Sequence, residues 1–171
     1  MKSRKLSNIS TQLPKCPAFF VDRSCGSKKL IAELRALGFD VKAHDDHFKK
    51  AEKDEVWLLK VGAKNWRVIT SDQELETLHR EEIVQGNVGV FILSDLRRGD
   101  TSQHWINMIH TCRDQIRHAA TRAGRPFVAR ISREGKLYQI RHIRAHAKIM
   151  DITDATELDA AVYGITSRSK S

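Results

Sequence analysis

The sequence has few cysteines and no long apolar run. Its three cysteines, Cys16, Cys25 and Cys112, lie far apart and show no Cys-x-x-Cys spacing, which argues against a disulfide framework and against a structural zinc site. No segment approaches the roughly 20 apolar residues that a membrane helix needs, and the N-terminal segment lacks the apolar centre of a secretory signal. We therefore expect a cytoplasmic protein whose thiols are reduced and packed.

Acidic residues are outnumbered by basic ones. The 171 residues include 30 Lys and Arg against 21 Asp and Glu, which gives a formal net charge of +9. Clustered Lys and Arg gain affinity for a polyanion by displacing counterions from its phosphates, so this balance suggests a polyanionic partner. A basic protein without such a partner is the alternative, because net charge reports on association and not on fold or chemistry.

Length and hydrophobic content allow one sizeable core. With 40% hydrophobic residues, a chain of 171 residues is expected to form one domain with tails. Residues 1–15 contain Lys2, Arg4, Lys5 and Lys15 but no acid, which predicts a basic flexible arm. We place the domain at residues 16–142 and a C-terminal tail, a weak helix or an interaction segment, at residues 143–171.

Apolar strands and amphipathic helices are predicted to alternate along the domain. Short runs rich in Val, Ile and Phe predict buried strands, and apolar residues at helical spacing predict the helices. The expected strands cover residues 17–22, 66–72 and 87–95, with a shorter one beginning near residue 39; the expected helices cover 27–38, 54–64, 73–86 and 101–124; a hairpin covers 127–140. This alternation indicates an α/β fold with a mainly parallel sheet covered on both faces.

Three segments carry predictions about local structure. Asp100 is followed three residues later by Gln103, which fits a capping box at the start of the helix at 101–124. The segment "HDDHF", residues 44–48, matches no zinc-ligand spacing and is expected to form a polar loop. The helix at 54–64 is expected to bury the face that carries Val56, Leu59 and Ala63, flanked by Trp57 and Leu58.

Carboxylates follow two of the predicted strands. Asp22 ends the first strand and Asp72 ends the third, and the carboxyl ends of parallel strands meet at one edge of a sheet. Asp54 and Glu55 open the helix that precedes the third strand. Carboxylates held close together share a proton or bind a cation, and hard oxygen ligands without thiolates favour Mg²⁺ or Mn²⁺. The sequence therefore predicts a divalent metal site at this edge.

Each acid also has a simpler interpretation. Asp22 and Asp72 could cap the helices that follow them, since aspartate is a preferred N-cap residue. Asp54 and Glu55 are ordinary residues for a first helical turn, where they complement the helix dipole. Glu74 and Asp95 are two further candidates for the site.

Four segments taken together resemble the PIN-like domains of VapC-type toxins. They are "FFVDRSCGSKKLIAELRALGFDV", "HDDHF", "DEVWLLKVGAKNWRVITSD" and "PFVARISREGKL", and the likeness covers residues 17–140. It implies a PIN-like three-layer α/β fold with an acidic site at the carboxyl edge of the sheet. It also implies a Mg²⁺- or Mn²⁺-dependent ribonuclease that is the toxin of a toxin-antitoxin pair and is restrained by an antitoxin protein.

The resemblance assigns roles to particular residues. The aspartate after the first strand of such domains matches Asp22, and the aspartate of the "TxD" turn matches Asp72. The acid that opens the "DEVW" helix matches Asp54, with Glu55 beside it. A fourth acid would be Glu74 or Asp95, and its identity decides between one metal ion and two; a hydroxyl near the metal in similar domains implies a supporting role for Ser24.

Basic residues are expected to bind the RNA beside this edge. The candidates are Lys28, Lys29, Arg97 and Arg98, with Arg113 and Arg117 as further basic residues, although Lys28 and Lys29 could equally be the solvated face of a helix. Aromatic residues make up only 6% of the chain, so few are free for base stacking, and single-stranded or looped RNA read by shape is the expected substrate. The alternative to an enzyme is a non-catalytic nucleic-acid-binding or interaction module with a degraded site. A homodimer is left open.

Overall fold

A computed structural model of the chain describes residues 15–145. The predicted arm at residues 1–15 lies, apart from its last residue, outside these described residues, as does most of the predicted tail at 143–171. Within residues 15–145, no helix is both long enough and apolar enough to cross a membrane.

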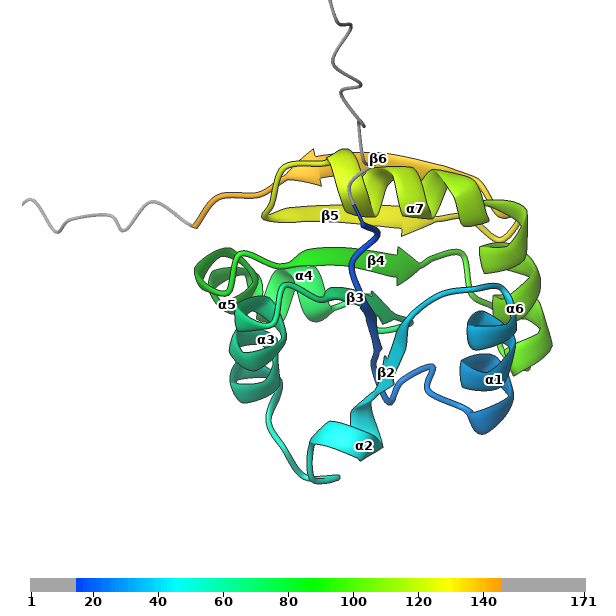
Figure 1. Cartoon of the computed structure of the whole chain (residues 1–171), viewed down its shortest axis with the longest axis horizontal. Helices are drawn as coiled ribbons and strands as arrows, with labels where there is room; N and C mark the ends of the chain where they lie inside the picture. Colours follow the sequence, from blue (N-terminus) through cyan, green and yellow to red (C-terminus); the bar gives the residue numbers. More distant parts are fainter. Residues whose placement is uncertain (1–14, 146–171) are drawn as a thin grey trace, which may run out of the picture.

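Six strands form one sheet, and seven helices lie between or beside them among the described residues (Figure 1). The strands are β1 (Phe19–Val21), β2 (Val41–Ala43), β3 (Arg67–Thr70), β4 (Gly89–Leu93), β5 (Phe127–Ile131) and β6 (Leu137–His142). The helices are α1 (Lys28–Ala36), α2 (His44–His47), α3 (Asp54–Ala63), α4 (Leu75–Leu78), α5 (Arg80–Gln85), α6 (Ser102–Thr111) and α7 (Arg113–Arg122).

The strand order is β2-β1-β3-β4-β5-β6. Strands β1 to β5 pair in parallel, and β6 pairs antiparallel with β5 to form the predicted C-terminal hairpin. The predicted α/β fold with a mainly parallel sheet is therefore confirmed, and it agrees with a PIN-like fold. The chain places β2 on one side of β1 and β3 on the other, so the strand order reverses between β1 and β3.

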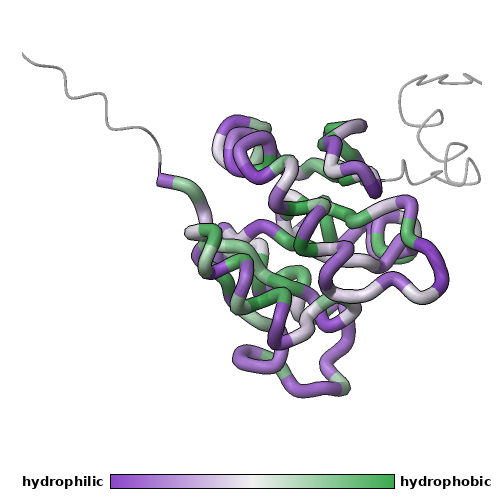
Figure 2. Tube along the Cα trace, turned by 90° about the vertical axis from the view of Figure 1, so that its right-hand side faces the viewer, coloured by the Kyte–Doolittle hydropathy of each residue, from purple (hydrophilic) through white to green (hydrophobic). Residues whose placement is uncertain are grey.

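Side chains on the strands alternate between two separate cores. Phe19, Val21 and Ile69 belong to the core beneath α1, α6 and α7, whereas Phe20 and Val68 belong to the core beneath α3, α4 and α5. A strand in the middle of a covered sheet must be apolar on both faces, which is why these strands are continuous apolar runs. Figure 2 shows the hydrophobic stretches gathered inside the trace and the hydrophilic ones around its outside.

Two glycines allow close contacts between elements. In α3, a Cβ atom at Gly62 would lie 1.9 Å from the carbonyl oxygen of Gly86, the residue that ends α5. In the β5–β6 turn, Gly135 has a φ of +73°, and a Cβ there would lie 2.9 Å from the carbonyl oxygen of Met108 in α6. The first contact fixes the position of α3, and the second holds the hairpin against α6.

The structure corrects three predictions about the helices. Residues 44–48 are not a loop throughout, because residues 44–47 form the short helix α2. The helix predicted at 73–86 is two helices, broken at His79, where φ is −122° and ψ is 32°. The helix predicted at 101–124 breaks at Cys112, whose thiol donates a hydrogen bond of 3.2 Å to the carbonyl of Met108.

The buried face of α3 also differs from the prediction. Trp57 and Leu58, expected to flank that face, are buried with Val61, whereas Val56 is exposed. Both faces have helical spacing in the sequence, and the face with the larger aromatic side chain removes more apolar surface from water.

The predicted capping box between Asp100 and Gln103 is wrong as well. Thr101 is the N-cap residue of α6, and its backbone N–H donates to Nδ1 of His104 at 3.2 Å. Asp100 instead accepts hydrogen bonds from the backbone N–H of Arg97 and from the guanidinium of Arg133. The carboxylate therefore joins two loops rather than capping the helix.

Candidate active site

The candidate site lies at the carboxyl edge of the sheet, where the strand order reverses between β1 and β3. Asp22 directly follows β1, and Thr70 is the last residue of β3. The backbone N–H of Asp22 donates to the carbonyl of Ile69 at 3.0 Å, which ties the start of one loop to the neighbouring strand. In open parallel sheets this position is where the two following loops separate and leave a crevice.

Two hydroxyls fix the carboxylate of Asp22. Its Oδ2 accepts hydrogen bonds from Ser24 Oγ at 2.7 Å and from Thr70 Oγ1 at 2.9 Å, and the Asp22 residue is only 8% exposed. The backbone N–H of Ser71 in turn donates to Ser24 Oγ at 3.0 Å. The two hydroxyl oxygens also lie 3.0 Å from each other, and this three-residue network holds the Asp22 side chain in one orientation.

Asp22 opens into a cavity of about 300 Å³. The cavity is bounded by the loop after β1, the start of α2 and the segment that leads into α3. Among the described residues its lining consists of Asp22, Arg23, Ser24, His44, Glu52 and Asp54. The structure therefore brings Asp22 and Asp54 to the same cavity, as the metal hypothesis requires, and it adds Glu52 and His44, which the sequence interpretation did not include in the site.

Asp54 has hydrogen-bonding partners of its own. Its Oδ1 accepts a bond of 2.6 Å from the indole N–H of Trp57, one helical turn later. Its Oδ2 lies 3.4 Å from Nε2 of His79, the residue between α4 and α5. The carboxylate thus connects the start of α3 with the next helices while it lines the cavity.

His44 is the most deeply buried polar side chain in this cavity. The residue is 4% exposed, its Nδ1 lies 3.3 Å from Asp45 Oδ1, and its ring contacts those of Phe20, Phe48 and Trp57. The sequence interpretation treated His44 as part of a polar loop. The signal that could have placed it is its position directly after a strand, on the same edge as Asp22.

Asp72 lies next to this cluster without lining the cavity. Its backbone N–H donates to Thr70 Oγ1 at 3.0 Å, and the same Thr70 oxygen contacts Asp22. Its carboxylate accepts a bond of 2.8 Å from the backbone N–H of Glu74 at the start of α4. The predicted N-cap roles are both wrong: Asp72 forms a turn before α4, whose N-cap residue is Glu74 and which has no side-chain cap, and α1 is capped by Ser27 and not by Asp22.

The other predicted site acids, Glu55, Glu74 and Asp95, are exposed and do not line the cavity. Glu55 points to solvent from the first turn of α3, and Glu74 precedes α4. Asp95 follows β4 with a φ of +58°, a left-handed conformation that aspartate tolerates in turns. The structure does not bring these three side chains together with Asp22 and Asp54.

A buried ionic cluster supports the loop that carries Asp72. Glu76 in α4 is 6% exposed, and its carboxylate accepts bonds of 2.8 and 2.9 Å from Arg141 and of 3.3 Å from Arg130. Arg130 also donates to the side-chain oxygen of Gln73 at 3.2 Å, and Gln73 donates to the carbonyl of Leu93. The hairpin arginines thus hold α4 against β4, a contact that sequence spacing did not reveal.

Of the predicted RNA-binding residues, Lys28, Lys29, Arg97 and Arg98 are exposed, whereas Arg113 and Arg117 in α7 are partly buried. Lys28 lines a smaller hollow that shares Arg23 and His44 with the Asp22 cavity. Lys29 is its neighbour in α1, and Arg97 and Arg98 lie in the loop after β4, which also leaves the carboxyl edge. Arg23 was not among the predicted residues, although it directly follows Asp22 in the sequence.

Cys25 lies beneath the site and cannot serve as its nucleophile. The thiol donates to the carbonyls of Asp22 and Ile69 at 3.6 Å each. Burial, and then the negative charge of Asp22, raise the pKa of the Cys25 thiol far above its ordinary value. The side chain remains protonated and acts as packing, because the thiolate is the nucleophilic form.

The cavity offers oxygen ligands for a hard cation. Asp22, Glu52 and Asp54 supply carboxylates, and Mg²⁺ is usually held by one or two carboxylates while it keeps several waters. Within residues 15–145, no group of three or more His, Cys, Asp or Glu side chains is placed to hold a metal ion directly. The residues therefore fit a hydrated cation at Asp22 and do not fit a cage made of protein ligands alone.

One family model matches part of the chain. Residues 17–95 match the family model described as a PIN-like domain. The matched segment contains β1 to β4 and, among residues 15–145, every residue that lines the Asp22 cavity. Neither the curated proteins nor the solved structures contain a match to this chain.

Proposed function

This chain carries a PIN-like domain, and we propose that it is a metal-dependent endoribonuclease whose active site is the Asp22 cavity. PIN-like domains are commonly nucleases, which supports the reaction class. The observation that carries the proposal is the oriented carboxylate of Asp22, which two hydroxyls hold at the edge of a carboxylate-lined cavity. Such an arrangement suits cation binding better than helix capping, because Ser27 already caps α1.

In this proposal Asp22 is the main ligand of a hydrated Mg²⁺ or Mn²⁺ ion, and Asp54 or Glu52 supplies the second carboxylate. When bound, such an ion lowers the pKa of its water and neutralises charge on a scissile phosphate. Ser24 and Thr70 keep the Asp22 carboxylate oriented. Charged hydrogen-bond donors that position a phosphate before reaction lower the barrier further, and in this proposal Arg23, which lines the cavity, is that donor.

Basic residues support RNA as the substrate. Arg23 and Lys28 line the neighbouring hollow, together with Asp45 and Asp46, and the whole chain has a net charge of +9. The logarithm of the binding constant falls linearly with the logarithm of the salt concentration, and each lysine or arginine that pairs with a phosphate of single-stranded nucleic acid makes that slope steeper by about 0.7. We expect RNA affinity to fall steeply with salt, and Lys28→Gln to reduce this slope while leaving the fold intact.

The resemblance of the quoted segments to VapC-type toxins supports a finer proposal. The protein would be the toxin of a toxin-antitoxin pair, restrained by an antitoxin protein that covers the Asp22 cavity. Co-expression with the product of a neighbouring small reading frame, followed by a cleavage assay on the complex, tests this role. Unchanged cleavage in the presence of each neighbouring protein would count against it.

Cleavage assays on matched variants test the nuclease proposal. Asp22→Asn keeps an oxygen for the two hydroxyls but removes the charge, and Asp114→Asn, which removes an exposed carboxylate in the first turn of α7, is the control. With Mn²⁺ and single-stranded RNA, we expect Asp114→Asn to cleave normally. Asp22→Asn should lose more activity than the roughly 10–100-fold caused by losing an outer-shell partner. Equal cleavage by both variants would refute the site.

One observation favours a second function, a non-catalytic nucleic-acid-binding module. The carboxylates of Asp54 and Asp72 already have local hydrogen-bond partners, and the described part of the chain contains no direct three-residue metal cluster. Such a module would bind RNA without cutting it, with equal affinity in the presence of EDTA and of Mn²⁺. Asp72→Asn distinguishes a structural role of Asp72 from a metal-binding role, because asparagine keeps the hydrogen bond from the backbone N–H of Glu74 but removes the negative charge.

A further inference from the structure

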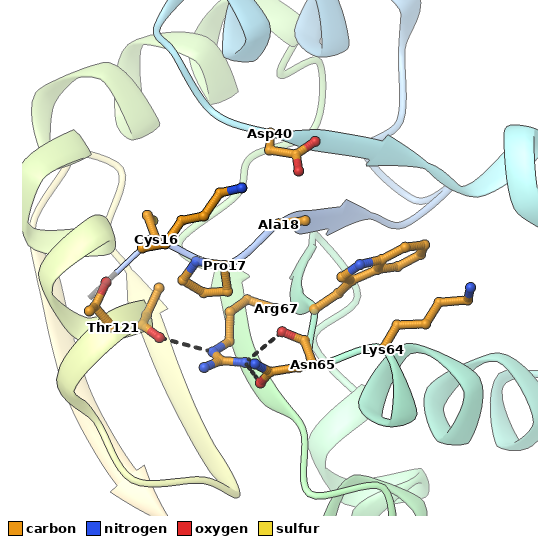
Figure 3. Close-up of a pocket in the computed structure, with 11 residues that line it drawn as sticks. Cys16, Pro17, Ala18, Asp40, Lys64, Asn65, Arg67 and Thr121 are labelled. Atoms are coloured by element: carbon orange, nitrogen blue, oxygen red, sulfur yellow. Dashed lines mark hydrogen bonds between the residues drawn. The ribbon is translucent and has the colours of Figure 1, made fainter. Parts of the chain in front are cut away.

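A second polar cavity lies at the amino edge of the sheet, opposite the Asp22 cavity. Its volume is about 410 Å³, and it is formed by the residues that lead into β1, β2 and β3 and by the end of α7 (Figure 3). Its charged lining residues among those described are Lys15, Asp40, Lys64 and Arg67. None of these residues takes part in the proposed nuclease site.

Arg67 is a buried cation whose hydrogen-bond partners are all neutral. The residue is 6% exposed, and its Nε donates to the carbonyl of Ala120 at 3.1 Å. Its Nη1 donates to the backbone and side-chain oxygens of Asn65, both at 3.0 Å, as the dashed lines in Figure 3 show. Within residues 15–145, Nη2 has no hydrogen-bond partner and no carboxylate pairs with the guanidinium.

A buried guanidinium without a counterion is costly unless an anion joins it. Burial, followed by the charge of Arg125, lowers the pKa of Arg67 to about 10, so the side chain is still a cation at neutral pH. The free Nη2 atom carries two N–H donors, and a guanidinium binds the oxygens of phosphate with such donors. Arg67 lines the cavity and its Nη2 keeps contact with solvent, so this donor pair, which has no partner among the described residues, is open to a ligand.

The charges around Arg67 also favour an anion. Lys15 and Lys64 line the same cavity and add two cations. Asp40 is the one acidic residue among the described lining residues, and its carboxylate pairs with Lys42 at 2.8 Å. The local field is therefore positive, and low-dielectric walls strengthen it.

We propose that this amino-edge cavity binds a phosphate group, with Arg67 as the buried anchor and with Lys15 and Lys64 at its mouth. The group belongs either to free inorganic phosphate or to the phosphorylated end of an RNA strand. The proposal is independent of the nuclease proposal, because the two cavities use different residues at opposite edges of the sheet.

Cys16 provides a direct readout of occupancy. It lines the cavity and is partly exposed, whereas Cys25 and Cys112 are each 1% exposed. Burial raises the pKa of the Cys112 thiol to about 11, which slows its reaction further. Iodoacetamide should therefore alkylate Cys16 first in the full chain. With phosphate at about ten times its Kd, mass action leaves about a tenth of the cavities empty, so alkylation of Cys16 slows about tenfold.

The test compares alkylation rates with phosphate and with chloride at equal ionic strength, in EDTA so that RNA stays intact. Slowing by phosphate alone supports the site. Arg67→Gln should abolish protection, and circular dichroism shows whether that variant is folded. If it is not, Lys15→Gln/Lys64→Gln decides, with Lys49→Gln/Lys50→Gln as the exposed control of equal charge loss. Protection that survives in the Lys15/Lys64 variant, or that is lost equally in the control, overturns the proposal.

A second arm identifies the source of the phosphate. One RNA oligonucleotide is used with a 5′-phosphate and with a 5′-hydroxyl. Protection by inorganic phosphate and not by either RNA supports a small free anion as the ligand. Stronger protection by the 5′-phosphorylated RNA supports a strand end. Equal alkylation rates in chloride, in phosphate and with both RNAs overturn the phosphate site altogether.

Discussion

Replacing Gly62 by alanine is expected to destabilise the protein and to displace the helix that carries Asp54. A Cβ at Gly62 would lie 1.9 Å from the carbonyl oxygen and 2.7 Å from the carbonyl carbon of Gly86, and both atoms are backbone. Cβ contacts below 3.0 Å essentially never occur, so α3 and the end of α5 must separate by at least about 1 Å.

The expected change in the free energy of unfolding of Gly62→Ala is the balance of two opposing effects. Overpacking of this kind costs about 1–3 kcal/mol or more, whereas alanine favours the helix over glycine by about 1 kcal/mol. The cost should dominate because the clashing atoms belong to backbone and cannot rotate away. We expect Gly62→Ala to lower the free energy of unfolding by about 2 kcal/mol, and the Tm by about 6 °C for a chain of this length.

Urea and thermal unfolding followed by circular dichroism measure this effect. Gly124→Ala is the matched control, because the nearest atom to a Cβ there is 3.5 Å away and φ is not positive. That variant should be as stable as the parent or up to about 1 kcal/mol more stable. If Gly62→Ala were as stable as Gly124→Ala, the close approach of α3 and α5 would be wrong. Nuclease activity of folded Gly62→Ala should also fall, because α3 positions Asp54.

Three further perturbations have defined outcomes. Thr70→Val keeps the shape of the side chain but removes a hydroxyl that orients Asp22, so RNA cleavage should become about 10–100-fold slower. Thr70→Ser keeps the hydroxyl and should cleave at close to the wild-type rate. Equal cleavage rates for Thr70→Val and wild type would exclude this positioning role. Glu76→Gln leaves Arg130 and Arg141 without their carboxylate, and the Arg141 side chain is 55% exposed and screened by solvent. We therefore expect the free energy of unfolding, measured in urea, to fall by about 2 kcal/mol. A change within about 0.5 kcal/mol would contradict the role of this cluster. A hydrogen bond from Arg133 lowers the pKa of Asp100 to about 2, so its stabilising effect is complete above about pH 4 and is lost as the pH falls through about 2. Asp100→Asn should therefore be less stable than wild type at pH 6, and the difference in unfolding midpoint should narrow toward pH 2; a constant difference would contradict this linkage.

The sequence was sufficient to predict the strands of the sheet and the position of Asp22 at its carboxyl edge. Residues 19–21 and 89–93 are continuous apolar runs because both faces of a central strand are covered. The apolar pattern alone was therefore enough to predict these strands. The aspartate after the first strand could then be placed at the carboxyl edge without knowing any contact. Strand order was not predictable in the same way, because it depends on how the crossovers pack.

Helix breaks and packing faces were harder to predict. In α3, two faces have acceptable apolar spacing, and only the neighbours of Trp57 decide between them. The break at Cys112 coincides with the place where Gly135 of the distant hairpin contacts α6, a tertiary contact that no local pattern contains. Local propensity therefore predicted the helical segments but not where they bend.

The candidate site illustrates the same limit. Asp22 and Asp54 are 32 positions apart in the sequence and share a cavity, yet Glu55 and Glu74, which were also candidates, are exposed and do not line it. Glu52 joins the cavity from a segment with no motif of its own. Acidic residue type and an element boundary identify candidates, but the direction of each side chain selects among them.

Binding of Mn²⁺ to the purified protein tests the central claim most directly, since it requires neither an RNA nor an antitoxin. Electron paramagnetic resonance of free Mn²⁺, titrated with wild-type protein and with Asp22→Asn, measures the bound fraction. The account predicts a Mn²⁺ site in the wild type that Asp22→Asn loses while it keeps the wild-type circular dichroism spectrum. Identical Mn²⁺ titrations for the two folded proteins would contradict it.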